Sequence, residues 1–245
     1  MRIAFRFKLI PFVATVLLVA LGIALGQWQT RRADDKLALQ ARVAAANAQA
    51  PLRLDGTPVD LARAEWRRVR VSGTFVADWP LYLDNRPQAG RAGLYVLMPF
   101  RIDGSDSHVL VLRGWLPVDG AQRTRIAPYA TPAGHVTLEG IARRDAGHVM
   151  QLGQAAGMAP GVIVLNADVA QVAAASGLQF QPFVLQQTSG GTDTLVRDWP
   201  APALGIEKHR GYAFQWYALA LTAFLFFVVT GFISGRKSER KSGRK

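Results

Sequence analysis

One histidine stands where its ring could bind the iron of a cofactor. His209 lies two residues before a long uncharged run, and Tyr212, Ala213 and Trp216 follow it at helical spacing. On an α-helix these residues share a face that offers an imidazole, aromatic edges and a small residue leaving room beside them. Neutral imidazole is a common axial ligand of haem iron, and aromatic neighbours suit a porphyrin plane. The other interpretation is an aromatic belt at a membrane interface with an incidental histidine.

A second cluster lies at the end of another uncharged run. Trp28 is followed by Arg31 and Arg32, and arginine forms paired hydrogen bonds with carboxylates such as haem propionates. The same arginines could equally do no more than hydrate the chain. Gly22 and Gly26 have the spacing that lets two membrane helices approach closely. If the two runs pack together, Trp28 and His209 should lie at similar depth.

Enzyme chemistry finds little support elsewhere in the chain. There is no phosphate-binding loop, and no serine lies in a nucleophile-elbow context. His108, His135 and His148 lie in or beside expected turns and are expected to be solvated. The chain has no cysteine, so it offers no disulfide framework and no thiolate for copper, zinc or nucleophilic catalysis. We therefore expect a protein that is not an enzyme.

Two apolar runs must position these side chains. Residues 9–30 and 211–235 contain no charged residue, and about 20 residues cross a hydrocarbon core of about 30 Å. The sequence predicts transmembrane helices at residues 9–28 and 211–234. Residues 24–26 resemble a signal-peptide cleavage site, but the first run exceeds the usual apolar region of about 7–15 residues. A retained helix is therefore favoured.

The charges flanking the two runs predict an orientation. Residues 1–8 contribute +3 and residues 235–245 contribute +5 of the net charge of +12. Short basic flanks stay in the cytoplasm, so both termini are expected there and residues 29–210 outside. Because no Arg- and Ser-rich transit segment precedes the first helix, a bacterial inner membrane is favoured over an organelle. The basic tail is expected to touch anionic membrane lipids rather than nucleic acid.

The segment between the helices predicts an α+β, mainly antiparallel β domain, barrel- or sandwich-like. A helical stalk over 31–50 is expected to end before Pro51, and short helices are expected at 60–65 and 168–175. Alternating or continuous apolar residues bounded by turn signals predict the strands. The predicted strands are 66–75, 80–85, 94–102, 109–116, 136–143, 161–165, 183–187 and 194–198. Such closely spaced strands, with few helical crossovers, favour antiparallel pairing.

Four groups of residues resemble one known family. They are LGQWQTRR at 25–32, WRRVRVSGTF at 66–75, the set LDNRP at 83–87, GLYVLMPF at 93–100 and VLRGWLP at 111–117, and HRGYAFQW at 209–216. In this order, between two membrane helices, they resemble the Surfeit locus protein family, the membrane-bound assembly factors of haem-copper cytochrome oxidase. The motifs 85–87 and 113–115 are interpreted first as turn and packing elements, with partner contact as the alternative.

The resemblance implies a non-enzymatic role in delivering or inserting haem a during maturation of oxidase subunit I. It implies that His209 is the axial ligand with Trp216 as companion. We expect Tyr212, Trp28, Arg31 and Arg210 to belong to the same haem site. Oxidase subunit I and haem a synthase are the implied partners. The alternative is a membrane-anchored scaffold that binds oxidase subunits through its outer domain without touching haem.

One motif departs from the family pattern. The family often has Asn-Asn-His-Leu before the Tyr-Ala pair, whereas this chain has Glu207, Lys208, His209 and Arg210. The histidine remains, but its amide neighbours do not, and Lys208 and Arg210 are then expected to hold propionates. The departure leaves haem b open as an alternative to haem a.

Overall fold

The computed structural model describes residues 5–118, 120, 122, 124–151, 153, 157–200 and 205–242, with 236–242 described by their backbone alone. Residues 1–4, residues 201–204 of the predicted linker and the tail beyond 242 lie outside the described residues. The chain divides into two compact units. One consists of Met1–Ala41 with Pro202–Lys245, and the other of Arg42–Ala201.

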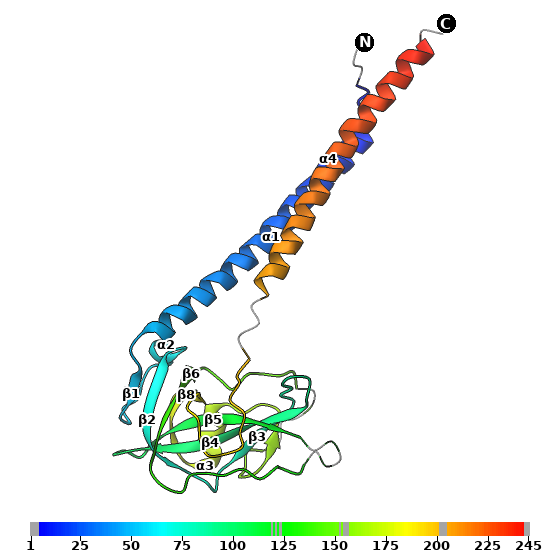
Figure 1. The fold of residues 1–245 in the computed structure, drawn as a ribbon. Helices are drawn as coiled ribbons and strands as arrows, with labels where there is room; N and C mark the ends of the chain where they lie inside the picture. Colours follow the sequence, from blue (N-terminus) through cyan, green and yellow to red (C-terminus); the bar gives the residue numbers. More distant parts are fainter. Residues whose placement is uncertain are drawn as a thin grey trace. The chain divides into compact units, whose positions relative to one another are not determined.

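Two long helices make up the first unit (Figure 1). Helix α1 spans Leu9–Ala48 and helix α4 spans Ile206–Ser242. Each contains a segment long and apolar enough to cross a membrane. Helix α1 continues beyond its apolar run because 31–48 consists of helix-forming residues without Gly or Pro. The predicted stalk ending before Pro51 is thereby confirmed, while the limits of the membrane spans stay a prediction.

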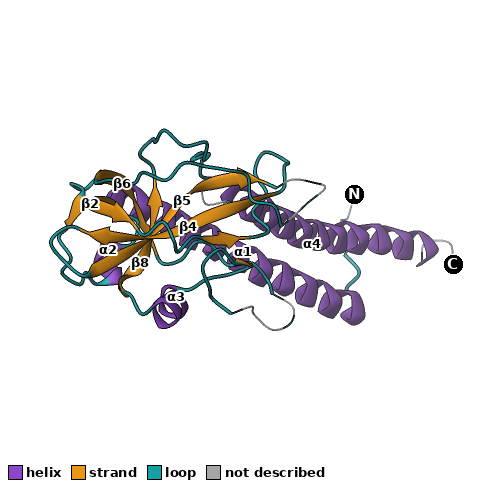
Figure 2. Ribbon diagram, turned by 90° about the horizontal axis from the view of Figure 1, so that it is seen from below, coloured by secondary structure: helices purple, strands orange, loops and turns teal. Residues whose placement is uncertain are grey.

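Five strands of the second unit close into a barrel (Figures 1 and 2). In ring order they are β2 (Arg68–Phe75), β6 (Val136–Arg143), β8 (Gln179–Gln187), β5 (Ser107–Pro117) and β4 (Gly93–Ile102), which pairs back with β2. All these pairs are antiparallel except β5 with β8. The mainly antiparallel domain is confirmed, and it is a barrel rather than a sandwich.

Short elements extend the barrel wall. Strand β1 (Leu52–Leu54) lies parallel to β2, β3 (Leu81–Leu83) lies antiparallel to β4, and β7 (Ile163–Val164) lies parallel to β3. Helices α2 (Leu61–Ala64) and α3 (Val169–Ser176) lie within one residue of the predicted limits and have Asp60 and Asp168 as their N-caps. The sequence did not predict β1. The strand predicted at 194–198 was wrong, because only Val196 pairs there, with Trp115.

Strand β5 is buried on both of its faces. Val109 and Val111 point into the barrel, whereas Leu110 and Leu112 face a second apolar cluster that includes Val172 of α3. A strand covered on both faces reads as a continuous apolar run rather than an alternation. The run Val109–Leu112 fits this arrangement. His108, which begins the run, is only 7% exposed, so the expectation of a solvated turn histidine was wrong there.

A buried charge cluster lies against the same strand. The Arg113 side chain is 1% exposed and forms an ion pair of 3.1 Å with Asp193, which also pairs with Arg197 at 2.6 Å. Burial lowers the pKa of the Arg113 guanidinium, and the nearby Asp193 carboxylate opposes that shift. Burial also raises the pKa of Tyr129, whose ring lies 5.4 Å from the Arg113 guanidinium carbon. These contacts tie β5 to two loops.

Candidate functional site

Helices α1 and α4 contact each other through small residues. A Cβ atom added to Gly22 would lie 2.9 Å from the Cβ of Ala220, and one added to Gly26 would lie 2.6 Å from the Tyr217 ring. Ala213 and Ala220 are the buried hydrophobic residues that α4 contributes to this contact. The close packing expected from the Gly22–Gly26 spacing is confirmed. This contact brings the histidine-bearing start of α4 beside the middle of α1.

The imidazole of His209 is held between two side chains of α1. Its Nδ1 lies 2.7 Å from Oε1 of Gln29, and its Nε2 lies 2.8 Å from Nζ of Lys36. Gln29 and Lys36 stand seven residues apart, two helical turns, and so share a face of α1. Gln29 directly follows Trp28, so Trp28 and His209 lie at a similar level along the helix pair. We call His209, Gln29 and Lys36 the histidine clamp.

The two contacts together define one protonation pattern of the ring. A lysine ammonium can only donate, so Nε2 of His209 must accept from Lys36. In the neutral imidazole the proton then lies on Nδ1, where it is donated to the carbonyl oxygen of Gln29. Histidines that bind metals commonly donate their other ring N–H to such an acceptor, which fixes the orientation of the ring. Nε2, whose lone pair accepts from Lys36, is therefore the ring nitrogen without a proton and the one that could bind a metal if Lys36 moved away.

The other predicted site residues lie around the clamp in different ways. Trp216 is half-buried, whereas Tyr212 and Trp28 are 52% and 50% exposed. The Arg32 guanidinium lies 6.0 Å from the Trp28 ring centre, so a sequence neighbour covers that aromatic face. Arg31 is exposed, and Arg210 is engaged in a 3.5 Å ion pair with Glu207. The structure thus brings His209 to α1. Among the described residues, none of these aromatic or basic side chains forms a hydrogen bond or ring contact with the imidazole.

Positive charge gathers where α4 begins. Lys36 reaches this end, since a Cβ on Gly205 would lie 3.8 Å from its Nζ. Lys208 and Arg210 follow in the first turn of α4, with Glu207 as the acidic residue there. A helix N-terminus carries partial positive charge and favours anions over cations. A carboxylate ligand would therefore find favourable electrostatics at this end of the helix pair.

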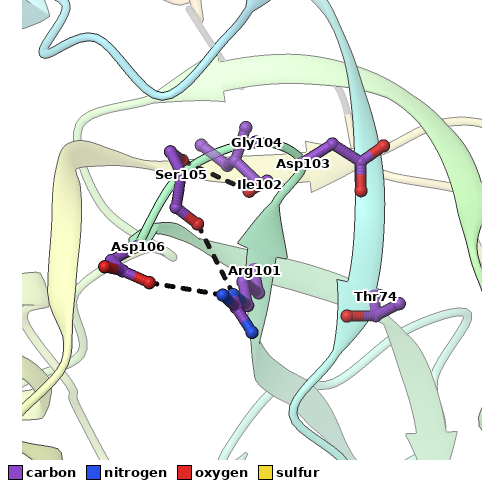
Figure 3. Close-up of a pocket in the computed structure, with 7 residues that line it drawn as sticks. All are labelled: Thr74, Arg101, Ile102, Asp103, Gly104, Ser105 and Asp106. Atoms are coloured by element: carbon purple, nitrogen blue, oxygen red, sulfur yellow. Dashed lines mark hydrogen bonds and ion pairs between the residues drawn. The ribbon is translucent and has the colours of Figure 1, made fainter.

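Hollows on the barrel unit offer less chemistry. The one in Figure 3 has a volume of about 330 Å³ and is lined by the turn between β4 and β5, which includes Asp103, Gly104 and Ser105. Arg101 pairs with Asp106 at 3.2 Å across it, both side chains being exposed, and Asp103 contacts His135. Among the described residues, no three His, Cys, Asp or Glu side chains gather as a metal site would require. The charged side chains at this turn are exposed to solvent and pair with one another.

The two motifs of uncertain role pack against each other. The indole N–H of Trp115 donates to the backbone oxygen of Arg86 at 2.6 Å. Arg86 is 6% exposed and donates to the backbone oxygens of Gly147 and Leu165. A Cβ on Gly114 would lie 2.6 Å from the Cβ of Leu195, which explains the glycine beside the bulky tryptophan. The packing interpretation is thereby confirmed.

Sequence reasoning missed Gln29 and Lys36, although a signal was present. Positions 22, 26, 29, 33 and 36 follow the alternating four–three spacing of a helix that packs along a second helix. Positions 209, 213, 216 and 220 repeat this spacing in α4. Gly22, Gly26 and Ala33 are the residues of α1 that become buried. Gln29 and Lys36 are the polar members of the same row, and a polar residue in such a row meets the partner helix.

Two apolar helices of membrane-crossing length, joined by a five-stranded barrel unit, define a membrane-anchored β-barrel protein. Residues 16–221 match the sequence profile of the SURF1 family. This match covers most of the chain and includes both the barrel and the histidine clamp. The chain belongs to the SURF1 family.

Individual relatives agree with this assignment. A SURF1-like protein of Monosiga brevicollis is 33% identical over 133 residues, which make up 49% of this chain and 49% of that protein. A SURF1-like protein of Drosophila melanogaster is 27% identical over 253 residues, covering 90% of this chain and 78% of the relative. The cytochrome oxidase assembly protein SHY1 of Saccharomyces cerevisiae is 28% identical over 116 residues, covering 46% and 28%. This chain spans about half the length of the first of these relatives.

Proposed function

We propose that this protein is an assembly factor for a haem-copper cytochrome oxidase, which binds haem between its two membrane helices and aids its insertion into oxidase subunit I. The family supports the assembly role, since the yeast relative is named a cytochrome oxidase assembly protein. The single observation that carries the haem part is the histidine clamp. The imidazole, hydrogen-bonded to Gln29 at Nδ1 and to Lys36 at Nε2, lies in the contact between α1 and α4, beside the cationic start of α4.

The residues present fit a haem. His209 would hold the iron through Nε2, while Gln29 keeps the ring oriented by accepting the Nδ1 proton. Trp216, two helical turns further along the same face of α4, would lie beside the porphyrin edge, with Trp28 and Tyr212 as further aromatic neighbours. Arg31, Lys208 and Arg210 would pair with the propionates. Bound haem supplies the redox iron of the finished oxidase, so a protein in this role binds and transfers the group and catalyses nothing.

The proposed cellular setting follows from the charges. We infer a bacterial inner membrane crossed twice, with both termini in the cytoplasm and the barrel outside. The reason is that basic residues flank each apolar run on the side of the nearer chain terminus. The barrel is then available to oxidase subunit I and to haem a synthase. The basic ends contact anionic membrane lipids, and nucleic acid is not a partner.

The test is an absorbance spectrum of the full-length protein purified in detergent after expression with haem a synthesis. Wild type is expected to show a Soret band that His209→Ala abolishes. Trp216→Leu should weaken the band, and His148→Ala, an exposed loop histidine, should leave it unchanged. Colourless wild-type protein would contradict haem binding and favour the scaffold alternative. In that case oxidase assembly would fail on deletion of the chain but survive His209→Ala. Expression with haem b alone separates haem a from haem b.

A further inference from the structure

We propose that Lys36 is a displaceable cap on His209 and that Gln29 is its positioning residue, so that two hydrogen bonds to one ring act in opposite directions on haem binding. This inference rests on the proposed function, because it concerns how the same imidazole is made available. Gln29 prepares the ring for iron. Lys36 holds the ring closed until a ligand displaces it.

The cap follows from the electron count at one atom. The Nε2 atom of a neutral imidazole has one lone pair, and in this structure that lone pair accepts the Lys36 ammonium at 2.8 Å. The same lone pair would have to bind the iron. Lys36 and iron therefore exclude one another at His209, and no proton needs to leave the ring for the exchange.

The chain allows Lys36 to move. Its flexible four-carbon stem carries a compact charge, and the side chain is half-buried where α4 begins, close to Gly205. Within the described residues its only hydrogen-bond partner is His209, and no carboxylate pairs with it. A propionate arriving with haem offers the ammonium a charged partner in place of a neutral one. Charge-assisted pairs are the stronger ones.

Gln29 has the opposite role because its bond survives the exchange. The Nδ1–H bond to Oε1 of Gln29, at 2.7 Å, lies on the far side of the ring from Nε2. It keeps the proton on Nδ1 and fixes the direction of the Nε2 lone pair. Without this acceptor, the proton is free to move to Nε2, which removes the ligating lone pair in part of the population.

An escort protein gains from such an arrangement. When Nε2 of His209 is uncapped in only a fraction of the molecules, the apparent affinity for haem is reduced by that fraction. With Lys36 as a competitor for Nε2, the protein therefore binds haem less tightly than it would through an uncapped histidine. Lys36 binds Nε2 again as haem leaves. The cap also keeps Nε2 hydrogen-bonded within the helix–helix contact when haem is absent, where an unpaired buried polar atom would be costly.

The test is a titration of the full-length, haem-free protein in detergent with two probes, haemin and haemin dimethyl ester, whose carboxylates are blocked. With the ester, Lys36→Met is expected to bind about tenfold more tightly than wild type and Gln29→Leu about tenfold more weakly. Gln29→Glu, which keeps an acceptor at this position, should bind the ester more tightly than Gln29→Leu and close to wild type. With haemin the gain in Lys36→Met should be smaller, because the lost ammonium no longer pairs with a propionate. Lys8→Met, which removes the same charge from an exposed position just before α1, should leave binding of the ester within about twofold of wild type.

Opposite signs distinguish this inference from a merely structural role, in which loss of either hydrogen bond would weaken binding. Weaker or unchanged ester binding by Lys36→Met overturns the cap, and unchanged binding by Gln29→Leu overturns the positioning role. An independent readout is ¹⁵N NMR of the four histidines in haem-free protein, where His209 should be protonated at Nδ1 in wild type and mixed in Gln29→Leu. If His209→Ala binds both probes as wild type does, the proposed ligand itself is wrong and the inference falls with it. If His209→Ala loses binding while Lys36→Met gains nothing, only the inference fails.

Discussion

Gly22 of α1 lies against Ala220 of α4 so closely that a Cβ at position 22 would be 2.9 Å from the alanine Cβ and 3.0 Å from the backbone oxygen of Trp216. Membrane helices associate largely through van der Waals contact, which small residues allow by letting the backbones approach. The histidine clamp depends on this approach, because Gln29 and Lys36 must reach across from α1 to His209.

Gly22→Leu is therefore expected to separate the helices and to destabilise their contact by about 1–3 kcal/mol, the usual cost of overpacking. Thermal unfolding in detergent measures this loss. Gly211→Leu provides the matched control, since nothing lies within 4 Å of a Cβ at position 211. Equal melting temperatures for the two variants would show that the contact between α1 and α4 does not stabilise the protein.

A second prediction concerns the buried charge cluster of the barrel unit. Asp193, whose side chain is 4% exposed, lies between the guanidinium groups of Arg113 and Arg197. Asp193→Asn would leave two buried cations facing each other, and breaking a buried pair in this way costs about 3–5 kcal/mol. Arg113→Met should cost less, because the Asp193–Arg197 pair survives. Chemical denaturation of the full chain in detergent compares the two.

Asp106→Asn is the control for this comparison. Its carboxylate pairs with Arg101 at a similar distance, but the Asp106 side chain is 94% exposed. Exposed ion pairs contribute little because solvent screens them, so the unfolding midpoint should not change. A smaller loss for Asp193→Asn than for Arg113→Met would contradict the role of Asp193 as the shared counter-charge.

The sequence predicted local structure well because local structure depends on neighbouring residues. Alternation from Trp66 to Phe75 predicted β2, and the absence of Gly and Pro predicted the continuation of α1 to Ala48. Closure of the barrel could not be predicted, because it depends on pairing between β2 and β4, where Gly73 lets the backbones meet. A Cβ on Gly73 would lie only 1.9 Å from the Arg101 oxygen.

The site was predictable in part for the same reason. The helical spacing of His209 and Trp216 marked a face of one helix, and Gly22 and Gly26 marked a face of the other. What each ring nitrogen of His209 touches depends on how α4 aligns with α1, whose Lys36 is 173 residues from His209 in sequence. Glutamine and lysine are common residues, and only their position in the row of small residues distinguished Gln29 and Lys36.

A third prediction concerns orientation and uses the absence of cysteine from the chain. A single cysteine can be introduced at Met150, which is 86% exposed on the barrel unit, or at Ser238 in the basic tail. With a membrane-impermeant thiol reagent on intact cells, Met150→Cys should be labelled and Ser238→Cys should be labelled only after lysis. Short basic flanks stay in the cytoplasm, which gives this expectation its direction. The reverse pattern would place the barrel in the cytoplasm and remove it from the outer side of the oxidase.

A fourth prediction concerns pH and His108. Burial lowers the pKa of this histidine below its ordinary value of 6.5, and hydrogen bonding to the backbone oxygen of Gln179 opposes the shift only in part. A folded-state pKa below the unfolded one means that the unfolded chain binds the proton more readily. The neutral ring therefore contributes full stability above about pH 6.5, and this contribution is lost as the pH falls below that value.

The melting temperature of wild type should drop between neutral pH and pH 5 by more than that of His108→Gln, which cannot be protonated in this range. His148→Gln, at an exposed loop position, should follow wild type. If His108→Gln and wild type lost stability in parallel, the acid sensitivity of the barrel would have to come from its carboxylates instead.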